Sequence, residues 1–307
     1  EDVGGCKLGA LGIPEFGTDF AMQMLIDTKP QAFSDLVRIA GLSHGTDVWL
    51  GNAQTLIEEG KATISTAICT RDDIMTYLIG KGLDSEQSFT IMESVRKGKG
   101  LKPEWEEEML AHDVPDWYIW SCKKISYMFP KAHAAAYVMM AYRIAYCKIN
   151  YPLAYYAAYF GIRASAFSYE LMGQGKEKLL YHMKEYKRRA ELNQLSKKDQ
   201  DTLKDMKNVL EMYARGFDFL PIDIYKSKAS KFQIVGDKLL PPFNTIDGMG
   251  DKAAEAMEIA AKDGPYLSKD DFRQRTKVSK TLVDLMADMG LLGDLPETNQ
   301  LSLFDFA

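Results

Sequence analysis

Residues 246–256 read Ile246-Asp247-Gly248-Met249-Gly250-Asp251-Lys252-Ala253-Ala254-Glu255-Ala256. Two glycines one residue apart lead into a predicted helix that is rich in small side chains. They permit a tight hairpin whose amides point outward at a helix N-terminus, where N–H groups and the helix dipole bind phosphate. This is the helix-hairpin-helix signature, which holds the nucleic-acid backbone without reading its sequence; an ordinary glycine turn is the alternative. The predicted DNA-backbone contacts are Gly248, Met249, Gly250 and Lys252.

The sequence around this hairpin is predicted to be mainly α-helical, because apolar residues recur at helical spacing on both sides of it. Gly41 is expected to end the second helix, and residues 43–46 to form a turn. The period changes to that of short strands at 219–224, 231–235 and 238–240. We therefore expect a mainly α fold with a small β element in its last third. The predicted helices cover residues 16–28, 32–39, 53–59, 71–80, 85–96, 103–111, 115–125, 132–149, 152–160, 168–214, 251–261 and 280–290.

Charge is unevenly distributed along the 307 residues, whose formal net charge is −5. No Lys or Arg follows Lys280, whereas five acidic residues do, and residues 1–60 contain nine acids and three bases. Residues 61–280 consequently carry a net charge of +6. From Trp117 to Tyr169 there are six bases, no acid and ten of the sixteen tyrosines. A positive, aromatic-rich stretch suits polyanions, while a buried helical pair with snorkelling lysines is an equally good interpretation.

Two further segments within the positive region are candidates for phosphate binding. Pro130-Lys131-Ala132-His133-Ala134-Ala135-Ala136-Tyr137 opens a predicted helix on which His133 and Tyr137 share one face. The alternative is a helix-packing seam of small alanines. Arg96-Lys97-Gly98-Lys99-Gly100 is a basic loop that could clamp phosphates, although a solvated cluster at a helix end is the commoner meaning of such runs.

The segment Gln300-Leu301-Ser302-Leu303-Phe304 lies in a predicted extended, acidic tail. A glutamine followed by apolar residues can insert as an extended peptide into a groove on a partner. It matches the pentapeptide with which bacterial replication proteins bind the sliding clamp. Docking of the segment back onto its own domain is the alternative.

Several classes of site are not indicated by the sequence. Cys6, Cys69, Cys122 and Cys147 form no Cys-x-x-Cys pair and do not cluster with the histidines, which favours reduced thiols and a cytoplasmic location. Nucleotidyl transfer by two metal ions requires paired carboxylates, and no convincing pair is present, so we expect no catalytic or metal-binding residue in this chain. No apolar run reaches the roughly 18 residues of a membrane span, and no membrane partner is expected.

Three long strings resemble one protein family: residues 11–17 (Leu-Gly-Ile-Pro-Glu-Phe-Gly), residues 41–49 (Gly-Leu-Ser-His-Gly-Thr-Asp-Val-Trp) and residues 129–137 (Phe-Pro-Lys-Ala-His-Ala-Ala-Ala-Tyr). With the hairpin and the tail, they are similar in order to the C-terminal part of the PolC-type DNA polymerase III alpha subunits, replicative polymerases of the C family. This resemblance implies a fingers domain at residues 1–166, a duplex-DNA-binding domain with tandem helix-hairpin-helix motifs at 167–292 and a clamp-binding tail at 293–307. The second hairpin, at residues 278–281, lacks the Gly-x-Gly form, which leaves its phosphate contact open.

The resemblance also implies roles for individual residues. The incoming dNTP would be contacted by Ser43, His44, Arg96, Lys99, Lys131, His133 and Tyr137. The tail residues Gln300, Leu301, Ser302, Leu303 and Phe304 would bind the beta sliding clamp.

The implied partners are primer–template DNA, the incoming dNTP, the clamp and the remaining polymerase domains (palm, thumb and exonuclease). Mg²⁺ would be held by the palm aspartates of the full-length enzyme, which this chain lacks, so the isolated chain is expected to be inactive. The alternative is a non-enzymatic module that binds DNA and tethers the clamp. A third possibility, a helix-hairpin-helix glycosylase, lacks a convincing acid after the hairpin.

Overall fold

The structure is a computed structural model that describes residue 3 and residues 5–299. The chain folds into two compact units. One comprises residues 10–145 and the other residues 146–307 together with residues 1–9; we call them the 10–145 unit and the 146–307 unit. The functional boundaries predicted at 166/167 and 292/293 remain predictions.

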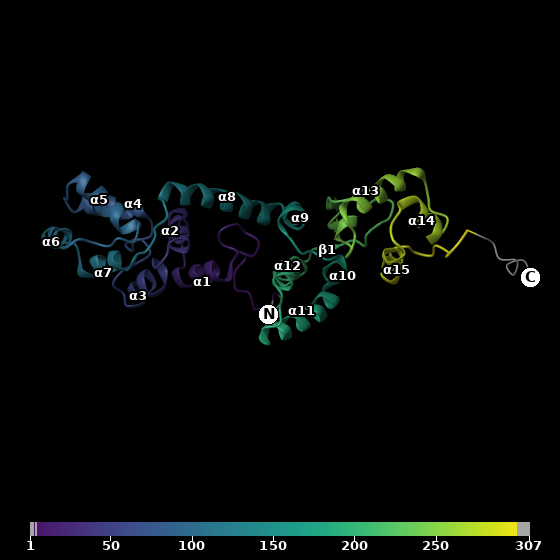
Figure 1. Cartoon of the computed structure of the whole chain (residues 1–307), viewed down its shortest axis with the longest axis horizontal. Helices are drawn as coiled ribbons and strands as arrows, with labels where there is room; N and C mark the ends of the chain where they lie inside the picture. Colours follow the sequence, from purple (N-terminus) through teal and green to yellow (C-terminus); the bar gives the residue numbers. More distant parts are fainter. Residues whose placement is uncertain (1–2, 4, 300–307) are drawn as a thin grey trace, which may run out of the picture. The chain divides into compact units, whose positions relative to one another are not determined.

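The 10–145 unit is built from short helices and most of the long helix α8 (Figure 1). Its core contains fully buried side chains from several of them, among them Ile39, Ile74, Leu78 and Ile91. The Tyr77 and Tyr118 rings stack 4.1 Å apart between α4 and α7. The helices are α1 (Asp19–Thr28), α2 (Phe33–His44), α3 (Gln54–Glu58), α4 (Arg71–Gly80), α5 (Ser85–Arg96), α6 (Pro103–Ala111), α7 (Asp116–Lys124) and most of α8 (Lys131–Asn150), with a π-turn at Trp49–Ala53.

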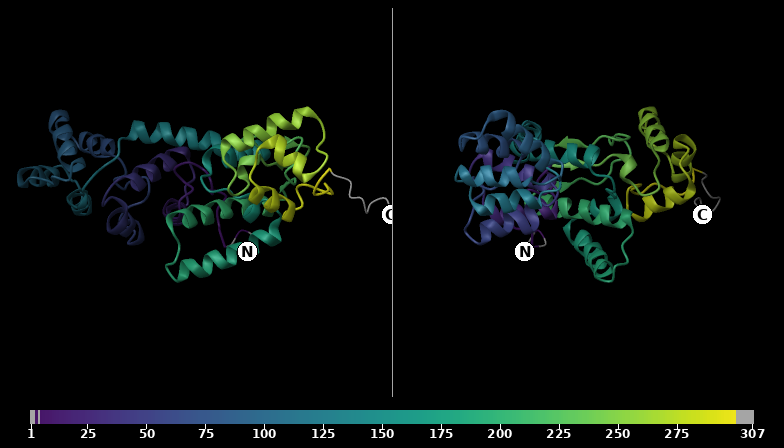
Figure 2. Two further views of the ribbon diagram at one scale, coloured as in Figure 1. Left: turned by 45° about the vertical axis from the view of Figure 1, so that its right-hand side comes forward. Right: turned by 60° about the vertical axis from the view of Figure 1, so that its left-hand side comes forward.

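The 146–307 unit begins with the end of α8 and continues mainly as helices. The helices α11 and α12 form a hairpin, which Figure 2 shows from two sides. The helices of this unit are α9 (Pro152–Ala158), α10 (Tyr169–Met172), α11 (Lys176–Glu191), α12 (Lys197–Ala214), α13 (Asp251–Ala260), α14 (Lys269–Thr276) and α15 (Lys280–Asp288). A π-turn at Tyr159–Arg163 and short 3₁₀ turns at Phe243–Thr245 and Ala261–Asp263 connect them.

A small sheet lies between the α11–α12 hairpin and α13 in the sequence. Its strands are β1 (Asp218–Phe219), β2 (Gln233–Val235) and β3 (Lys238–Leu240), in the order β1-β3-β2. The strand β3 pairs in parallel with β1 and antiparallel with β2. The prediction of a mainly α fold with a small β element in the last third is confirmed.

A buried ion pair joins α8 to α12 inside the 146–307 unit. The Lys148 Nζ lies 2.7 Å from Glu211 Oε1 and donates to the Gly9 carbonyl at 2.9 Å. The Tyr156 hydroxyl donates to the same Glu211 oxygen at 2.6 Å. Burial lowers the pKa of Lys148, and the Glu211 carboxylate opposes that shift. The end of α8 is therefore held by charge as well as by packing.

Three local expectations differ from the structure. The predicted helical stretch 168–214 is divided into α10, α11 and α12, with positive φ at Gly175 and Asn193 in the two breaks. The helix α2 continues past Gly41 to His44. A Cβ at Gly41 would lie 2.6 Å from Thr70 Cγ2 and 2.7 Å from the Cys69 carbonyl oxygen, so this glycine permits close packing and does not end the helix. The first predicted strand shortens from residues 219–224 to Asp218–Phe219, because Pro221 lacks the N–H that a continuing ladder requires.

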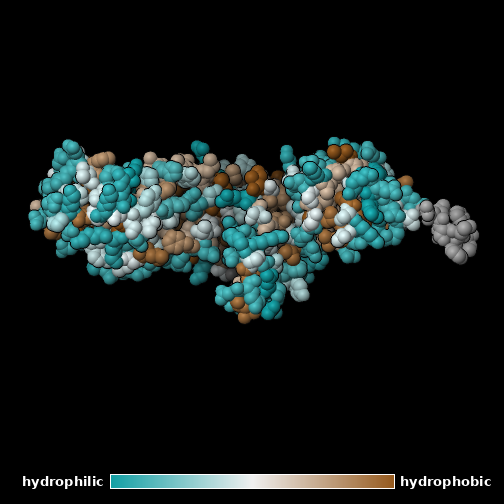
Figure 3. Space-filling view, in the orientation of Figure 1, coloured by the Kyte–Doolittle hydropathy of each residue, from teal (hydrophilic) through white to brown (hydrophobic). Residues whose placement is uncertain are grey.

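Hydrophilic side chains predominate on the face seen in Figure 3, in agreement with a mean hydropathy of −0.24. Among the described residues, no helix has both the length and the apolar character needed to cross a lipid bilayer.

Candidate nucleotide and DNA interfaces

The segment 126–130 brings together helix ends that are far apart in the sequence of the 10–145 unit. The Thr46 N–H, just beyond α2, donates to the Tyr127 carbonyl at 2.9 Å. The Met128 N–H donates to the carbonyl of Arg96, the last residue of α5, at 3.2 Å. The N–H of Arg71, which opens α4, donates to the Phe129 carbonyl at 3.2 Å. Since α8 starts at Lys131, the segment adjoins four helix ends, and three of them carry predicted nucleotide contacts.

A row of four rings runs from α2 to the first turns of α8. The ring centroids of His44 and Phe129 are 4.9 Å apart, those of Phe129 and His133 5.0 Å, and those of His133 and Tyr137 4.7 Å. His133 is exposed, and 47% of the Tyr137 surface is accessible. The structure thus brings together three predicted nucleotide contacts and adds Phe129, which the sequence reasoning did not single out.

Most of the predicted cationic contacts pair with a carboxylate. Arg96 makes a bidentate contact with Glu93, with Nη2 2.8 Å from Oε2, and Lys97 Nζ lies 2.9 Å from the same carboxylate. These hydrogen bonds lower the pKa of Glu93 to about 2 and raise the pKa of Arg96. The Lys131 Nζ lies 3.1 Å from Asp73, and the His44 ring contacts Glu15.

The first turn of α8 carries a further carboxylate that the sequence did not reveal. The backbone N–H of Lys131 donates to Asp72 Oδ2 at 2.7 Å. A carboxylate of this chain therefore occupies an amide at the start of the segment that we considered for phosphate binding. The side of α8 that carries His133 and Tyr137 remains open to a ligand.

The two other predicted contacts differ in how they are held. The Ser43 hydroxyl donates to the Ala40 carbonyl at 3.0 Å, so it is directed toward its own helix. The side chain of Lys99 is exposed, and its backbone N–H donates to the Ser94 carbonyl at 3.0 Å. Glu93 lies three and four residues before Arg96 and Lys97. This spacing on a helix favours ion pairs, so the sequence alone could have revealed the pairs of Glu93 with Arg96 and Lys97.

The first hairpin of the 146–307 unit has the form that its two glycines predict. Gly248 adopts φ +82°, and both Gly248 and Gly250 are exposed. The Met249 side chain between them is buried in the core of the unit, which anchors the hairpin. The Ser168 hydroxyl donates to Asp247 Oδ2 at 2.7 Å. The exposed Lys252 lies in the first turn of α13.

The second hairpin lies beside the first. A Cβ built on Gly248 would be 3.7 Å from Leu282 Cδ2 in the first turn of α15. Here Lys277 adopts the left-handed conformation, with φ +61°, and Ser279 caps α15 by accepting from the Leu282 N–H at 3.3 Å. The two hairpins therefore share one edge of the unit, where Lys277 and Lys280 are exposed.

The sequence reasoning did not predict the helix that precedes the second hairpin. This helix, α14, begins after Ser268, whose hydroxyl accepts from the Asp271 N–H at 3.0 Å. The serine three residues before an acid is an N-terminal signal that could have revealed it.

Over residue 3 and residues 5–299, no group of three or more His, Cys, Asp and Glu side chains is arranged to hold a metal ion. The four cysteines are free thiols. The predicted clamp-binding residues 300–304 lie outside the described residues.

Comparison with known proteins supports the resemblance drawn from the motifs. Residues 6–114 match the bacterial DNA polymerase III alpha subunit finger domain, and residues 216–301 match a helix-hairpin-helix motif. The chain is 53% identical over 300 residues to DNA polymerase III PolC-type from Caldanaerobacter subterraneus. It is 54% identical over 306 and 304 residues to the proteins of that name from Bacillus cereus and Bacillus subtilis.

These alignments include 97–99% of the chain but only 21% of each relative. The resemblance is confirmed by an identity that extends through both units. We conclude that the chain is related to the PolC-type DNA polymerase III proteins over nearly its whole length and corresponds to a fragment of about one fifth of theirs.

Proposed function

We propose that this chain is the part of a replicative DNA polymerase that contacts the incoming dNTP, the primer–template duplex and the sliding clamp. The observation that carries the proposal is the identity of 53–54% with PolC-type DNA polymerase III over nearly all of the chain. Catalytic carboxylates, the thumb and the exonuclease would belong to the rest of a longer, cytoplasmic protein. The fingers would comprise residues 1–166, the duplex-binding domain 167–292 and the clamp tail 293–307.

For the dNTP, the proposal rests on the row of rings and the cations around segment 126–130. The exposed His133 and Tyr137 offer ring surface for stacking or hydrogen bonding. Arg96 uses Nε and Nη2 to hold Glu93, and its other N–H donors can bind phosphate, because guanidinium has five donors in a planar fork. Glu93 thereby orients Arg96. Lys99 and Lys131 would add charge that stabilises the departing pyrophosphate.

For the duplex, the exposed Gly248 and Gly250 and the charge of Lys252 would bind backbone phosphate, while the predicted contact Met249 is buried and donates its N–H to the Ile246 carbonyl at 3.0 Å. Mg²⁺ would supply the two-metal chemistry of nucleotidyl transfer from the palm of the longer protein. Without that palm, the isolated chain should bind DNA and incorporate no nucleotide. Incorporation of dNTP by the pure chain with Mg²⁺ would contradict this division of labour.

The dNTP assignment can be tested by Arg96→Ala and His133→Ala in the full-length polymerase. Loss of a hydrogen bond to a charged group costs about 1.5–3 kcal/mol, so kcat/KM for dNTP should fall by about 10- to 100-fold. Lys61→Ala is the matched control, because Lys61 is an exposed lysine of the same unit that pairs with Glu59. Unchanged KM and kcat in both variants would refute the assignment.

The clamp assignment can be tested by a pull-down on the beta sliding clamp. The chain with and without residues 300–304 would be compared at equal concentration. Retention should disappear with the deletion and persist in the Ser302→Ala variant, which keeps the apolar side chains. Undiminished retention after the deletion would overturn the clamp assignment and leave the DNA assignment intact.

A further inference from the structure

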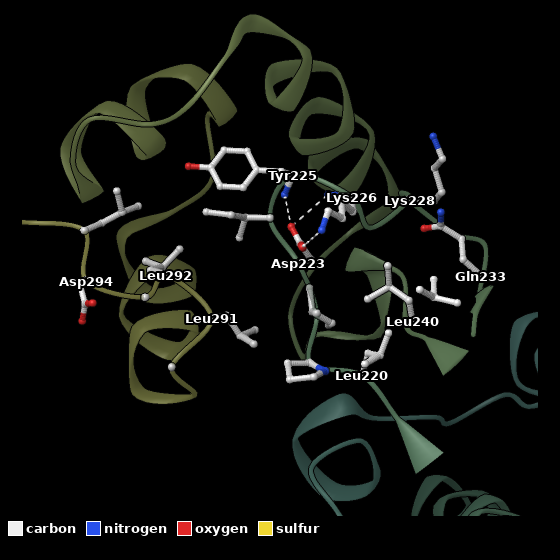
Figure 4. A pocket seen from close by; sticks show the side chains of 17 residues that line it. Leu220, Asp223, Tyr225, Lys226, Lys228, Gln233, Leu240, Leu291, Leu292 and Asp294 are labelled. Carbon is white, nitrogen blue, oxygen red and sulfur yellow. Dashed lines mark hydrogen bonds and ion pairs between the residues drawn. The ribbon is translucent and has the colours of Figure 1, made fainter. Parts of the chain in front are cut away.

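A groove of about 1020 Å³ opens in the 146–307 unit (Figure 4). One wall consists of Leu291, Leu292 and Leu295, just beyond α15. The 220–240 segment forms the other side, with apolar residues such as Leu220, Ile222, Ile224, Val235 and Leu240 next to the polar Asp223, Lys226, Lys228 and Gln233. No residue of either predicted hairpin lines it, so the groove is separate from the proposed phosphate contacts.

One polar atom in this apolar groove lacks a partner. The Gln233 side-chain oxygen is buried and accepts no hydrogen bond from any described residue. A buried acceptor without a donor costs about 1–3 kcal/mol. Charge does not select the occupant, because Lys226 and Lys228 pair with Asp223 and Glu258 at 3.6 and 3.2 Å, and Asp294 also lines the groove. An occupant with apolar side chains and hydrogen-bond donors would therefore suit it.

The chain's own tail has this chemistry and starts next to the groove. Residues 300–307 read Gln-Leu-Ser-Leu-Phe-Asp-Phe-Ala. They supply apolar side chains and backbone N–H groups, which are the donors that the Gln233 oxygen lacks. The Lys269 and Asp270 N–H groups donate to the carbonyls of Pro296 and Glu297, at 2.8 and 3.1 Å. This anchors the chain two residues beyond Leu295, a lining residue.

The tail is long enough to reach the near wall of the groove, which Leu295 lines. Consecutive Cα atoms are about 3.8 Å apart, so Glu297 lies within about 8 Å of Leu295. The seven residues from 298 to 304 span up to about 23 Å when extended. A reversal of direction near residues 298–300 would bring Leu301, Leu303 and Phe304 to the groove.

We propose that this groove binds residues 300–307 of the same chain as an extended peptide. The residues that fill it are those predicted to bind the sliding clamp, so the tail can occupy one site at a time. The docking of the tail in the groove does not depend on clamp binding. Competition between the groove and the clamp for the tail rests on the proposed function. A short linker gives a tethered peptide an effective concentration in the mM range. A Kd of about 100 μM for the tail is therefore sufficient to keep the groove mostly filled.

The test uses a fluorescein-labelled peptide with residues 298–307 and the chain lacking residues 300–307. Val235 and Ile234 are neighbours on β2 and are 46% and 49% exposed, but only Val235 lines the groove. Binding with a Kd of about 100 μM or tighter is expected, weakened at least tenfold by Val235→Asp and unchanged by Ile234→Asp. A Kd above about 1 mM, or equal losses in both variants, would overturn the proposal.

Hydrogen exchange on the full chain provides a second readout that does not depend on the groove variants. Amides at 220–228 and 289–295 should exchange faster when Leu303→Asp and Phe304→Asp are combined, and at the normal rate in Ser302→Ala. Identical exchange in all three proteins would also refute docking. If docking is found and Val235→Asp leaves clamp affinity unchanged, the clamp assignment fails and the groove assignment holds.

Discussion

The two hairpins around residues 248–250 and 278–281 form one edge of the 146–307 unit, which we call the hairpin edge. Single residues determine whether this edge can form. Gly248 and Gly250 look equivalent in the sequence, but only Gly248 has positive φ, at +82°. Gly250 has φ −77° and acts as the N-cap of α13, with open space around its missing Cβ. Only Gly248 therefore occupies a position that requires positive φ. Gly250 leaves the surface free for close approach by a nucleic-acid backbone.

This difference predicts unequal effects on stability. Gly248→Ala should lower the free energy of unfolding by about 1–2 kcal/mol, the cost of the left-handed conformation for a residue with a Cβ. Gly250→Ala should change it by no more than about 0.5 kcal/mol. Urea denaturation of both variants measures the contrast, and equal losses would contradict the described hairpin.

The ion pairs of Glu93 predict a pH dependence of stability. Its folded pKa of about 2 lies well below the ordinary value for a glutamate, because Arg96 and Lys97 hydrogen-bond to the carboxylate. A depressed carboxyl pKa stabilises the fold above the unfolded pKa, and this contribution is lost as pH falls through the folded pKa.

The wild type should therefore exceed Glu93→Gln in unfolding free energy at pH 7, with a difference that shrinks from about pH 5 toward pH 2. Denaturation series at pH 7, 5 and 3 would reveal it. A difference that is constant over this range would show that the carboxylate is not stabilised by its partners.

Among the helices, α8 carries different functions at its two ends. Its first turns carry Lys131, His133 and Tyr137 of the proposed nucleotide site, and its last turn carries the buried Lys148. Taking both charges of Lys148 and Glu211 out of water is costly, and their mutual attraction and the Tyr156 hydroxyl offset that cost. Removing one charge would leave the other buried without its counter-charge.

A double-mutant cycle tests this pairing. Glu211→Gln and Lys148→Met should each lower the free energy of unfolding by about 3–5 kcal/mol, the cost of an uncompensated buried charge. The double variant should lose less than the sum of the two single losses. Urea denaturation of the four proteins gives the coupling energy, and strictly additive losses would argue against a direct interaction.

At the scale of the whole molecule, local signals were sufficient to predict many elements. The bounds of α4, α5 and α6 agree with expectation. The Asp73 carboxylate accepts from the Thr70 N–H at the start of α4, the Asp84 side chain caps α5, and Pro103 fixes φ at the start of α6. The prediction that Gly41 ends a helix was wrong, because this glycine is needed for packing against residues 69 and 70. No local pattern reveals a contact so far along the chain.

The site was predictable in part for the same physical reason. The motif containing Lys131, His133 and Tyr137 was visible in the sequence, but its surroundings depend on tertiary contacts. Asp73 reaches Lys131 from 58 positions away, and Glu15 reaches His44 from 29. These carboxylates change the proposed site from an open cluster of cations to a paired one.

The central claim is that the hairpin edge holds DNA by its phosphates. The most direct test is fluorescence anisotropy of a labelled primer–template with the 307-residue chain between 50 and 200 mM salt. Lys252 and Lys262 are exposed lysines near opposite ends of α13, which makes Lys262→Ala the matched control. The account predicts salt-dependent binding whose log–log slope falls by about 1 in Lys252→Ala and is unchanged in Lys262→Ala. Binding that is independent of salt, or an unchanged slope in Lys252→Ala, would contradict it.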